Sequence, residues 1–528
     1  VVALTLSPVM CSLILKPEDP NKKKNIFPCR VPSPDISPLK AIRHSRCHHL
    51  PVSDCFFIQK GTFMNDSKKI SLPSVQIPTL ECDVLVAGAG TAGCIAAIAA
   101  ARQGASVILI EKLPVPGGTY TNGGIGANSF YAMSTDPSTA KRVVGGIPYE
   151  LNQRLVDLCG GTGYYPTPND PHHNPYRFVG DHEIYKGVVS QMLLEAGVTV
   201  LLQTTCYDVL TENGKITAAL IANKDGCSAI AAKQYIDASG DGDLARFAGL
   251  EQIDMWQDYH TVSGGSTGLV FGMAGVDIDR MVKENPQGAV KLSSAELDVS
   301  GMCAEQYAFT TMKDPERYQA ISALEMRPFT SMSSIHKGEM TYINNSKGVD
   351  CDATKALDYS TAELKMRVKI MQFANALKTT VPGFEESYIN WAAIQLGVRA
   401  SKITICDHMI SLDEITSATR FEDEIGLFGF EDLMNYKHPE CEIKDPGFYG
   451  FPYRMLLPKG CDNLLMAGRC VTTDIKAHMS TRNVPGCQVM GQGAGVAAAL
   501  CAKKDCTTRE LSYPVLRDAL LAQGVILE

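Results

Sequence analysis

The chain has 528 residues, of which 45% are hydrophobic and 20% charged, and its formal net charge is −8. This length allows two or more large domains with a deep core, and the composition is that of an ordinary globular protein. The acidic balance gives no general electrostatic reason to expect nucleic acid as a partner. The 18 cysteines are scattered without a CxxC pair. They argue against a disulfide scaffold, a zinc site or an iron–sulfur cluster, and favour a cytoplasmic enzyme with reduced thiols.

Residues 1–63 differ in character from the rest of the chain and are predicted to be a non-native or disordered extension. The apolar stretch at 1–16 is too short and too interrupted by proline for a membrane span, and it lacks the basic start of a signal peptide. No stable membrane insertion is therefore expected, with a membrane anchor as the competing interpretation. His44, Cys47, His48 and His49 can be drawn as a metal site. A solvated segment is the preferred interpretation, and no metal is predicted.

The first organised segment, VLVAGAGTAGCIAAIAAARQGASVILIEK, predicts a strand, a glycine turn, a helix and a second strand. Gly88, Gly90 and Gly93 have the GxGxxG spacing. Such glycines permit a tight turn, close approach of a pyrophosphate and close packing of the helix on the strand. Glu111 ends the second strand, where a carboxylate accepts hydrogen bonds from ribose hydroxyls. The segment predicts a dinucleotide site and leaves the choice between NAD and FAD open.

Glycines crowd the segment after this unit, at positions 117, 118, 123, 124 and 126. A backbone so rich in glycine passes close to something flat or charged, and we interpret it as a wall of the cofactor site. Helices are predicted over 147–158 and 181–196. Strands are predicted over 198–202, 207–210, 216–222 and 229–238, with a hairpin turn at 212–215. The last strand leads into Gly240, Asp241 and Asp243, a second strand-to-helix contact for phosphate or ribitol.

The C-terminal part repeats this arrangement of a buried strand followed by a helix. The strand at 463–470 ends in Gly468 and Arg469. Pro485 is a suitable first residue for a helix that extends to 502, and the glycines at 491, 493 and 495 allow that helix to pack tightly. The helix N-terminus is an anion site, which in a flavoenzyme can face the pyrimidine edge of the isoalloxazine.

Five segments together resemble the FAD-dependent oxidoreductase family, in the branch distantly related to the flavoprotein of fumarate reductase and succinate dehydrogenase. They are GAGTAGCIAAIAAARQGASVILIEK, IDASGDGDLARFAG, VPGFEESYINWAAIQLGVRAS, YGFPYRMLLPKGCDNLLMAGRC and AHMSTRNVPGCQVMGQGAGVAAAL. The resemblance implies FAD rather than NAD. It also implies an α/β fold, in which an FAD-binding Rossmann-like three-layer (β/β/α) domain carries an inserted α+β substrate or cap domain.

The expected domain organisation follows from this resemblance. The N-terminal part of the FAD-binding domain is expected at 78–260 and its C-terminal part at 451–510. The substrate or cap domain is expected at 261–450, with an amphipathic helix near 360–377, and a C-terminal helix or tail at 511–528.

The resemblance also implies FAD contacts, residue by residue. They are Gly88, Ala89, Gly90, Thr91, Ala92 and Gly93 at the pyrophosphate, Glu111 and Lys112 at the adenosine ribose, Cys206 at the adenine through its backbone, Gly118, Thr119, Gly240 and Asp241 at phosphate or ribitol, Gly468 and Arg469 at the ribitol, and Pro485, Gly486 and Cys487 at the flavin ring. Succinate dehydrogenase-type proteins often attach FAD through a histidine in the glycine-rich loop. No histidine occurs between Glu111 and Tyr131, so non-covalent FAD is predicted.

Hydride transfer to a flavin requires placement of the substrate, a proton donor or acceptor, and charge stabilisation. His478 is the candidate acid or base, and Arg482 is the candidate clamp for an anionic group. Arg399 is a third catalytic candidate, and Arg454 a weaker one. The alternative for each is structural: a satisfied buried histidine, or an arginine paired with a carboxylate. For the pair His172–His173 a solvated loop is preferred.

The expected function is an oxidoreductase that transfers hydride between non-covalently bound FAD and a small organic substrate, for which the arginine and histidine candidates favour an anion. Two alternatives stay open: a flavin-binding subunit that passes electrons to a partner, and a flavoprotein monooxygenase. A disulfide reductase is disfavoured because the chain lacks a redox cysteine pair and a second dinucleotide fold. The sequence does not predict the substrate, the reaction direction, the electron donor or acceptor, or the oligomeric state.

Overall fold

The computed structural model describes residues 76–528, except 135, 168–173, 263–264, 296, 298–300, 325–328, 345–348 and 430–441. All of these residues belong to one unit, Val75–Glu528. The predictions for residues 1–63 and for the histidine and cysteine cluster at 44–49 lie outside the described residues. The same is true of His172 and His173.

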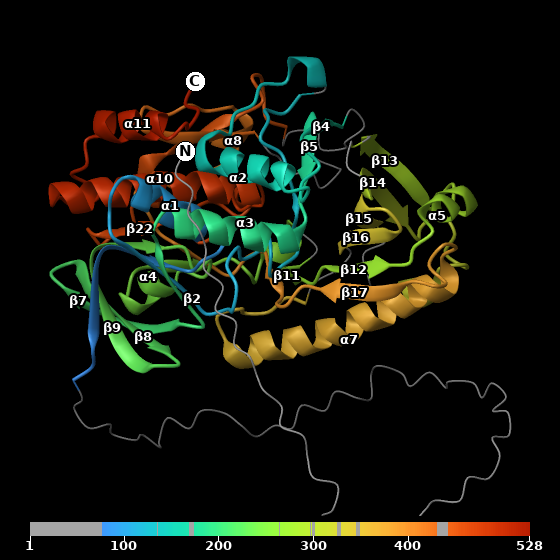
Figure 1. Ribbon diagram of the computed structural model, residues 1–528, viewed down its shortest axis with the longest axis horizontal. Helices are drawn as coiled ribbons and strands as arrows, with labels where there is room; N and C mark the ends of the chain where they lie inside the picture. Colours follow the sequence, from blue (N-terminus) through green and yellow to red (C-terminus); the bar gives the residue numbers. More distant parts are fainter. Residues whose placement is uncertain are drawn as a thin grey trace, which may run out of the picture. The chain divides into compact units, whose positions relative to one another are not determined.

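A seven-stranded sheet with five parallel strands forms the base of one part of the structure, called here the parallel-sheet part (Figure 1). Its parallel strands are β6 (Thr199–Leu202), β2 (Val107–Glu111), β1 (Thr79–Ala87), β9 (Gly226–Asp237) and β22 (Leu464–Met466), in this spatial order. The hairpin β7 (Thr205–Glu212) and β8 (Lys215–Asn223) continues the sheet antiparallel from the first half of β9. Because the parallel strands run the same way, their carboxyl ends meet at one edge, where ligands bind in such sheets.

Two helices pack closely on this sheet, α1 (Thr91–Arg102) and α10 (Val484–Lys504). A Cβ added to Gly491 would lie 2.2 Å from the carbonyl O of Ala92. One added to Gly495 would lie 2.2 Å from the carbonyl O of Ala96. Each pair of residues is four apart, so the contact repeats after one helical turn. Small residues therefore set the distance between α1 and α10.

The inserted part contains a six-stranded antiparallel sheet. Its strands, in spatial order, are β13 (Ala289–Ala295), β14 (Met302–Thr310), β15 (Phe329–His336), β16 (Glu339–Asn344), β12 (Phe271–Ala274) and β17 (Tyr388–Ala392). The helix α7 (Ala356–Thr380) buries Met366, Ile370, Phe373 and Leu377 in the same hydrophobic cluster and runs alongside β17 in Figure 1. The amphipathic helix predicted near 360–377 is confirmed and extends further at both ends.

Two short ladders connect the inserted part to the parallel sheet. β10 (Gln252–Asp254) pairs with β19 (Lys402–Thr404), and β11 (Thr267–Gly268) pairs with β18 (Gly397–Val398). The outgoing connection, which leads into the insertion at 252–268, and the returning connection, which leaves it at 397–404, therefore run side by side. The hydrophobic cluster of the insertion takes its members from 269–396, whereas buried residues of 400–457 share the cluster of the parallel sheet. The expected borders at 261 and 450 stay predictions.

The other elements complete these two parts. The remaining helices are α2 (Gly146–Asp157), α3 (His182–Glu195), α4 (Asp243–Phe247), α5 (Ile278–Glu284), α6 (Gln319–Ser322), α8 (Leu412–Thr416), α9 (Ala477–Thr481) and α11 (Tyr513–Ala522). The small sheets contain β3 (Ala127–Asn128), β5 (Tyr176–Val179) and β4 (Tyr165–Pro166), and β20 (Glu424–Phe428) with β21 (Tyr449–Pro452). The helices predicted over 147–158 and 181–196 are confirmed as α2 and α3. In the part of the chain that the structure describes, no helix combines the length and apolar character needed to cross a bilayer.

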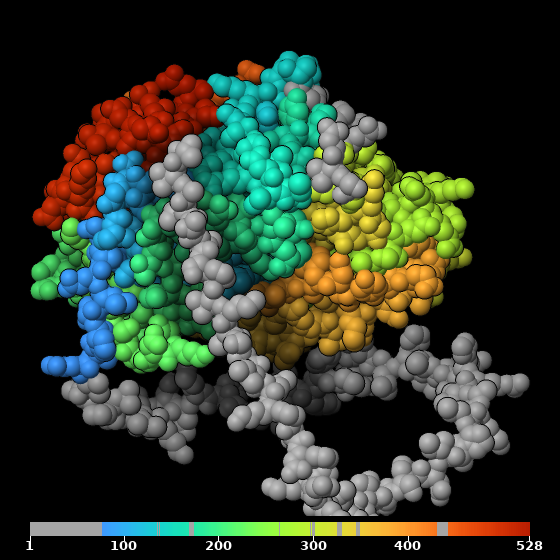
Figure 2. All heavy atoms as spheres, in the orientation of Figure 1, coloured from blue at the N-terminus to red at the C-terminus, as the bar shows by residue number. Residues whose placement is uncertain are grey.

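The insertion contacts the parallel-sheet part at the start of α3. Tyr342 Oη donates to the carbonyl O of Gly180 at 2.6 Å and accepts a hydrogen bond from His182 N at 3.1 Å. In Figure 2 the teal surface around α3 borders the yellow surface of the inserted sheet. The predicted fold class, a Rossmann-like α/β domain with an inserted α+β domain, is confirmed by the strand order of the two sheets.

Candidate functional site

The glycine loop between β1 and α1 contains positions at which only glycine fits. Gly88 has φ +98°, and a Cβ on it would lie 2.6 Å from the carbonyl O of Ala238. A Cβ on Gly93 would lie 1.8 Å from the carbonyl O of Gly88, so α1 starts directly against the end of the strand. Gly90 differs, because the nearest atom to an added Cβ is Gly118 Cα at 3.9 Å. No side chain caps the N-terminus of α1, so its first amides suit an anionic group.

Glu111 is buried at the end of β2, and its carboxylate braces the glycine loop. Oε2 accepts a hydrogen bond from Ala89 N at 2.8 Å, and Oε1 accepts one from Leu113 N at 2.9 Å. Burial raises the pKa of Glu111, and these main-chain hydrogen bonds oppose the rise. Contact between Glu111 and a ribose stays a prediction. Lys112 is more exposed, and its Nζ lies 3.9 Å from Asp241 Oδ2.

The glycine-rich segment after β2 crosses the start of α1. Gly118 has φ +53°, and a Cβ on it would lie 2.6 Å from Gly90 Cα. Gly117 N donates to the carbonyl O of Ala89 at 2.8 Å. Thr119, in the same turn, is exposed. The structure thus brings residues 88–93 and 118–119 together, as the predicted pyrophosphate site requires.

Cys206 follows a segment that crosses the carboxyl end of β2. In that segment Thr204 N donates to the carbonyl O of Glu111 at 2.8 Å. The Cys206 thiol donates to the carbonyl O of Asp208 at 3.3 Å, and burial raises its pKa to about 12. The main chain near Cys206 therefore lies beside the strand ends, while its contact with adenine stays a prediction.

The segment after β22 reaches the same place from the other end of the chain. Gly468 has φ +88°, and a Cβ on it would lie 3.1 Å from Ala92 Cβ and 3.9 Å from Cys487 Sγ. Gly468 therefore lies between the first turns of α1 and α10. The Cys487 thiol donates to the carbonyl O of Arg482 at 3.1 Å, and burial raises its pKa to about 12. These contacts favour a packing role for Cys487.

Like α1, α10 begins without a side-chain cap. Asn483 occupies the N-cap position, but its Nδ2 donates to carbonyl groups of α9, those of Met479 and Ser480. Pro485 and Gly486 form the first turn. Two uncapped helix N-termini therefore lie on either side of Gly468, an arrangement suited to negative charge.

Asp241 and Arg469 form a partly buried ion pair near the carboxyl edge of the sheet. Arg469 Nη2 donates to Asp241 Oδ1 at 2.9 Å, and Arg469 Nη1 donates to Ser401 Oγ at 2.7 Å. Ser401 Oγ donates to Asp241 Oδ1 at 2.7 Å. Burial acts to raise the pKa of Asp241, but the charges of Arg469 and Lys112 and the hydrogen bond from Ser401 lower it overall. Gly240 has φ +79° and packs against the Arg469 guanidinium.

His478 is buried, and one of its ring nitrogens has a fixed partner. Nε2 lies 3.0 Å from the carbonyl O of Arg469. Because a carbonyl oxygen only accepts, Nε2 carries the proton. Burial, and then the charge of Arg482, lower the pKa of His478 to about 3, so the ring is neutral and Nδ1 carries a lone pair. Among the described residues Nδ1 has no hydrogen-bond partner, and a bound ligand can satisfy such a buried acceptor.

Tyr259 joins His478 and Arg482 into one cluster. Arg482 Nε donates to Tyr259 Oη at 2.6 Å. The ring centroids of Tyr259 and His478 are 5.7 Å apart, with the rings edge to face. The structure therefore brings these two catalytic candidates together, and their catalytic roles stay predictions.

Arg399 lies between the two connecting ladders. Its Nη1 donates to the carbonyl O of Gly265 at 3.2 Å and to that of Thr267 at 2.9 Å. These bonds tie the returning connection to the outgoing one. The geometry favours the structural alternative for Arg399, whose catalytic role stays a prediction. Arg454 Nη2 lies 3.6 Å from Asp423 Oδ1, which agrees with the structural alternative for Arg454.

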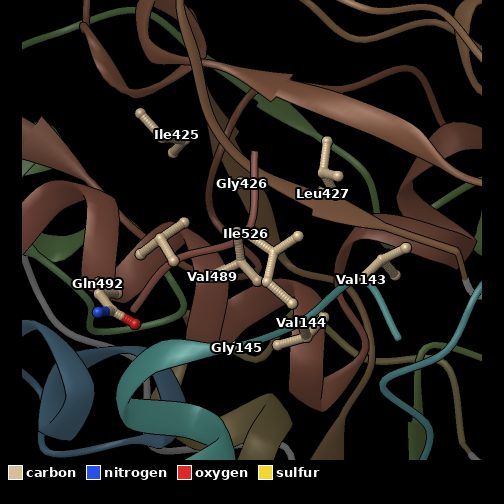
Figure 3. A pocket seen from close by; sticks show the side chains of 10 residues that line it. Val143, Val144, Gly145, Ile425, Gly426, Leu427, Val489, Gln492 and Ile526 are labelled. Atoms are coloured by element: carbon tan, nitrogen blue, oxygen red, sulfur yellow. The ribbon is translucent and has the colours of Figure 1, made fainter. Parts of the chain in front are cut away.

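A small apolar pocket contains none of the predicted site residues (Figure 3). Its lining consists of Val143, Val144, Gly145, Ile425, Gly426, Leu427, Val489, Gln492, Val525 and Ile526. Gln492 Oε1 accepts a hydrogen bond from Ile147 N at 3.2 Å, and Gln492 Nε2 donates to the carbonyl O of Gln523 at 3.2 Å. Both polar ends of the amide thus have protein partners, and we assign the pocket to packing around α10.

The family model for FAD dependent oxidoreductase matches residues 83–520. The chain belongs to the FAD dependent oxidoreductase family. The matched range includes both parts of the parallel sheet and the whole insertion. The predicted family, the oxidoreductase class and the FAD cofactor are confirmed.

Curated relatives match this chain only in part. L-aspartate oxidase of Halobacterium salinarum is 28% identical over 196 residues, which cover 31% of this chain and 38% of the relative. Digeranylgeranylglycerophospholipid reductase of Thermoplasma acidophilum is 25% identical over 207 residues, which cover 37% of this chain and 48% of the relative. The chain therefore spans less than half the length of these relatives. A geranylgeranyl bacteriochlorophyll reductase-like structure from Thermoplasma acidophilum is 13% identical, with a TM-score of 0.39 and coverage of 84% and 83% of the two chains.

The residues of this chain fit FAD, the cofactor of its family. A Cβ on Gly90 would meet only Gly118 Cα, at 3.9 Å, and the first amides of α1 and α10 lack side-chain caps. The residues suited to hold the pyrophosphate are Gly90 and Gly118, and Gly468 lies beside the first turns of both helices. In the described ranges, no group of three or more His, Cys, Asp or Glu side chains is arranged to hold a metal ion.

Two side chains of this site, Ser401 and Tyr259, were not among the predicted residues. Both lie near the connections to the insertion, 160 and 223 residues along the chain from Asp241 and Arg482. A serine and a tyrosine at such separations have no local pattern that marks them. One sequence feature could have pointed to Ser401: it is the last residue of VPGFEESYINWAAIQLGVRAS, a segment that resembles the family.

Proposed function

We propose that this protein transfers hydride between non-covalently bound FAD and a small organic substrate, with an anionic substrate favoured. The observation that carries the proposal is the meeting of the uncapped N-termini of α1 and α10 around Gly90, Gly118 and Gly468. Helix N-termini and exposed backbone amides are suited to a pyrophosphate and to the negative charge of a reduced flavin.

The cluster next to α10 supports the substrate assignment. Tyr259 orients Arg482, whose guanidinium is suited to bind a carboxylate or another anionic group. Neutral His478 presents Nδ1 as a hydrogen-bond acceptor. FAD, when bound, supplies the centre that accepts or donates hydride. The chain's own residues would orient the substrate and accept a hydrogen bond from its reacting hydroxyl or amine.

We assign the insertion to the substrate domain on its position. It joins the parallel sheet through two adjacent connections, and its own hydrophobic cluster lies within 269–396. The FAD-binding parts would then be 78–260 and 451–510, with 511–528 as a closing helix. The packing of 400–457 with the parallel sheet favours an end of the insertion near 398 rather than 450.

The cofactor part of the proposal is tested by an absorption spectrum of the purified protein, repeated on the supernatant after acid precipitation. We expect a flavin spectrum whose colour leaves with the supernatant. Colour that stays in the pellet overturns the non-covalent assignment. A folded, colourless protein that FAD does not reconstitute overturns the proposed site.

The substrate part is tested by anaerobic bleaching of the flavin. Small hydroxy acids and dicarboxylic acids are each compared with the matching amides. We expect bleaching by acids, strongly slowed in Arg482→Gln and not in Arg454→Gln, whose arginine pairs with Asp423. Bleaching by a partner protein alone would favour an electron-transfer subunit. Oxygen-coupled hydroxylation of a substrate would favour a monooxygenase.

A further inference from the structure

A buried hydroxyl connects the insertion's returning chain to the Asp241–Arg469 pair. Ser401 lies immediately before β19 and is 2% exposed. Its O–H donates to Asp241 Oδ1 at 2.7 Å, while its oxygen accepts from Arg469 Nη1 at 2.7 Å. Arg469 Nη2 completes the triangle on Asp241 Oδ1 at 2.9 Å. A hydroxyl donates and accepts at once, so it can bridge a carboxylate and a guanidinium.

We propose that Ser401 is a positioning residue for FAD, which fixes the orientation of the Asp241–Arg469 pair. The inference rests on the proposed function, in which Asp241 and Arg469 lie against the phosphates and ribitol. Without the Ser401 hydroxyl, the guanidinium keeps only its Nη2 bond to Asp241 within the triangle. Its planar fork then loses the second contact that sets its angle.

The triangle also connects the insertion to His478. The carbonyl O of Ser401 accepts a hydrogen bond from Met255 N at 2.8 Å, on the outgoing connection. Arg399, two residues before Ser401, binds carbonyl groups of that same connection. On the other side, the carbonyl O of Arg469 holds His478 Nε2. A shift of the connections would therefore reach the Asp241–Arg469 pair through Ser401, and His478 through Arg469.

FAD dissociation constants, measured by flavin fluorescence, test the proposal. The variants are Ser401→Ala, Ser401→Thr and the matched control Ser266→Ala. Ser266 lies on the outgoing connection, is 0% exposed, and has its hydroxyl against Cys351 instead. We expect Ser401→Ala to raise the dissociation constant about tenfold to hundredfold, since hydrogen bonds to charged groups are lost. Ser401→Thr, which keeps the hydroxyl, is expected to stay within about threefold of wild type, and Ser266→Ala within about twofold.

A double-mutant cycle tests whether Ser401 acts through Asp241. In the Asp241→Asn background, Ser401→Ala is expected to change the dissociation constant less than about twofold, because the pair it positions is already altered. Full additivity of the two changes overturns the proposal. Unchanged FAD affinity in a folded Ser401→Ala variant, or an equal loss in Ser266→Ala, also overturns it. If Ser401→Thr does not fold, the comparison of Ser401→Ala with Ser266→Ala and the double-mutant cycle still test the proposal. A wild-type protein that binds no FAD would instead refute the proposed function, so the two failures are distinguishable.

Discussion

Two buried groups near the site differ in charge: His478 is neutral and Asp241 is ionised. His478 is neutral because burial and the Arg482 charge disfavour a second positive charge. Asp241 is ionised because Arg469, Lys112 and the Ser401 hydroxyl outweigh the effect of burial. Both pKa values are lowered, which leaves the histidine neutral and the carboxylate charged, and buried groups with shifted pKa values often mark functional sites. His478 is therefore the first residue to test for a part in the reaction.

Two substitutions separate the roles of the His478 nitrogens. His478→Gln keeps an N–H for the carbonyl O of Arg469, so we expect FAD affinity within about threefold of wild type. Neither glutamine nor alanine keeps the imidazole lone pair, so we expect turnover to fall about 100-fold or more in both variants. Steady-state rates and flavin titrations measure the two effects. A glutamine variant that turns over within a few-fold of wild type would return His478 to a structural role.

The pH dependence of turnover gives an independent prediction for His478. Its pKa is lowered to about 3, so its protonation does not change between about pH 5 and pH 8. Any step in the pH profile of the wild-type rate over this range is therefore expected to be present in His478→Gln as well. A histidine-dependent step in the profile of kcat/KM, with the substrate's own ionisation controlled, would contradict this assignment.

The glycines of the site could be predicted from the sequence, and the hydroxyl residues could not. Gly88 and Gly118 have positive φ and backbone neighbours at 2.6 Å, constraints that a local pattern can report. Ser401 and Tyr259 act on partners far along the chain, and their residue types occur in many roles. The position of Glu111 was predictable, but its use in bracing the Ala89 amide depends on the exact course of the loop.

At the scale of elements, the contact between α1 and α10 depends on the absence of side chains. A Cβ at position 491 would meet the carbonyl O of Ala92 at 2.2 Å, and backbone cannot move aside cheaply. We expect Gly491→Ala to lower the free energy of unfolding by about 2–3 kcal/mol, and to weaken FAD binding because the first turns of both helices shift. Urea denaturation followed by circular dichroism measures the stability.

Gly187→Ala is the matched control for this substitution. Gly187 lies within α3, and nothing lies within 4 Å of a Cβ added there. Alanine is the better helix former, so we expect a gain of about 0.5–1 kcal/mol. Equal effects of the two substitutions would show that helix propensity, rather than the α1–α10 distance, controls the result.

An ion pair between α3 and the insertion makes stability depend on pH. His336 Nε2 lies 2.8 Å from Oδ2 of Asp181, the N-cap residue of α3. The hydrogen bond that His336 donates to Asp181 raises the pKa of His336 above 6.5, although burial opposes the rise. The stabilisation is therefore complete below about pH 6.5 and is lost as the pH rises through the raised value. The His336 side chain is 36% exposed, so solvent screening limits the effect to about 0.5 kcal/mol.

Urea denaturation at about pH 6 and pH 8 measures this effect. We expect the free energy of unfolding to fall between the two values in wild type, and to fall less in His336→Gln. His260→Gln is the control, because the His260 ring lies against the carbonyl O of Gln257 on its own segment. A pH dependence that His336→Gln leaves intact would assign it to other groups.

The helices were more predictable than the strands of the insertion, for a physical reason. The helices α3 and α7 have apolar residues at helical spacing and polar residues elsewhere, so one element carries its own signal. β14 is buried along most of its length on both faces, and its sequence MCAEQYAFT has no regular alternation. Its pairing with β13 and β15 depends on residues outside the strand, so the sequence analysis predicted an α+β insertion without its strand order.

At the scale of the whole molecule, the described chain has two main hydrophobic clusters joined by a small third one. The large cluster takes its described members from outside 269–396, and the second lies within that range. The third cluster contains Tyr165 and Val179 of the parallel-sheet part together with Val270 and Ile335 of the insertion. The insertion is thus attached at two paired connections and one shared contact surface.

Excision of the insertion tests whether the parallel-sheet part folds alone. Thr267 and Val398 are cross-strand partners, so a short glycine–serine turn can replace residues 269–396 without moving either end. Ser401, Asp241 and Arg469 all remain. We expect a folded, monodisperse protein with bound FAD of reduced affinity and no turnover of substrate. Gel filtration, circular dichroism and the flavin spectrum measure these properties.

The third cluster determines how this experiment can fail. Excision exposes Tyr165 and Val179, which now pack against the insertion, but it removes no described member of the large cluster. A product that binds FAD yet aggregates at high concentration would locate the loss at this exposed surface. A product unfolded at every concentration would show that the clusters fold as one cooperative unit. A product that still oxidises or reduces substrate at the wild-type rate would contradict the assignment of the insertion as the substrate domain, because the groups that select substrate would then lie within the parallel-sheet part.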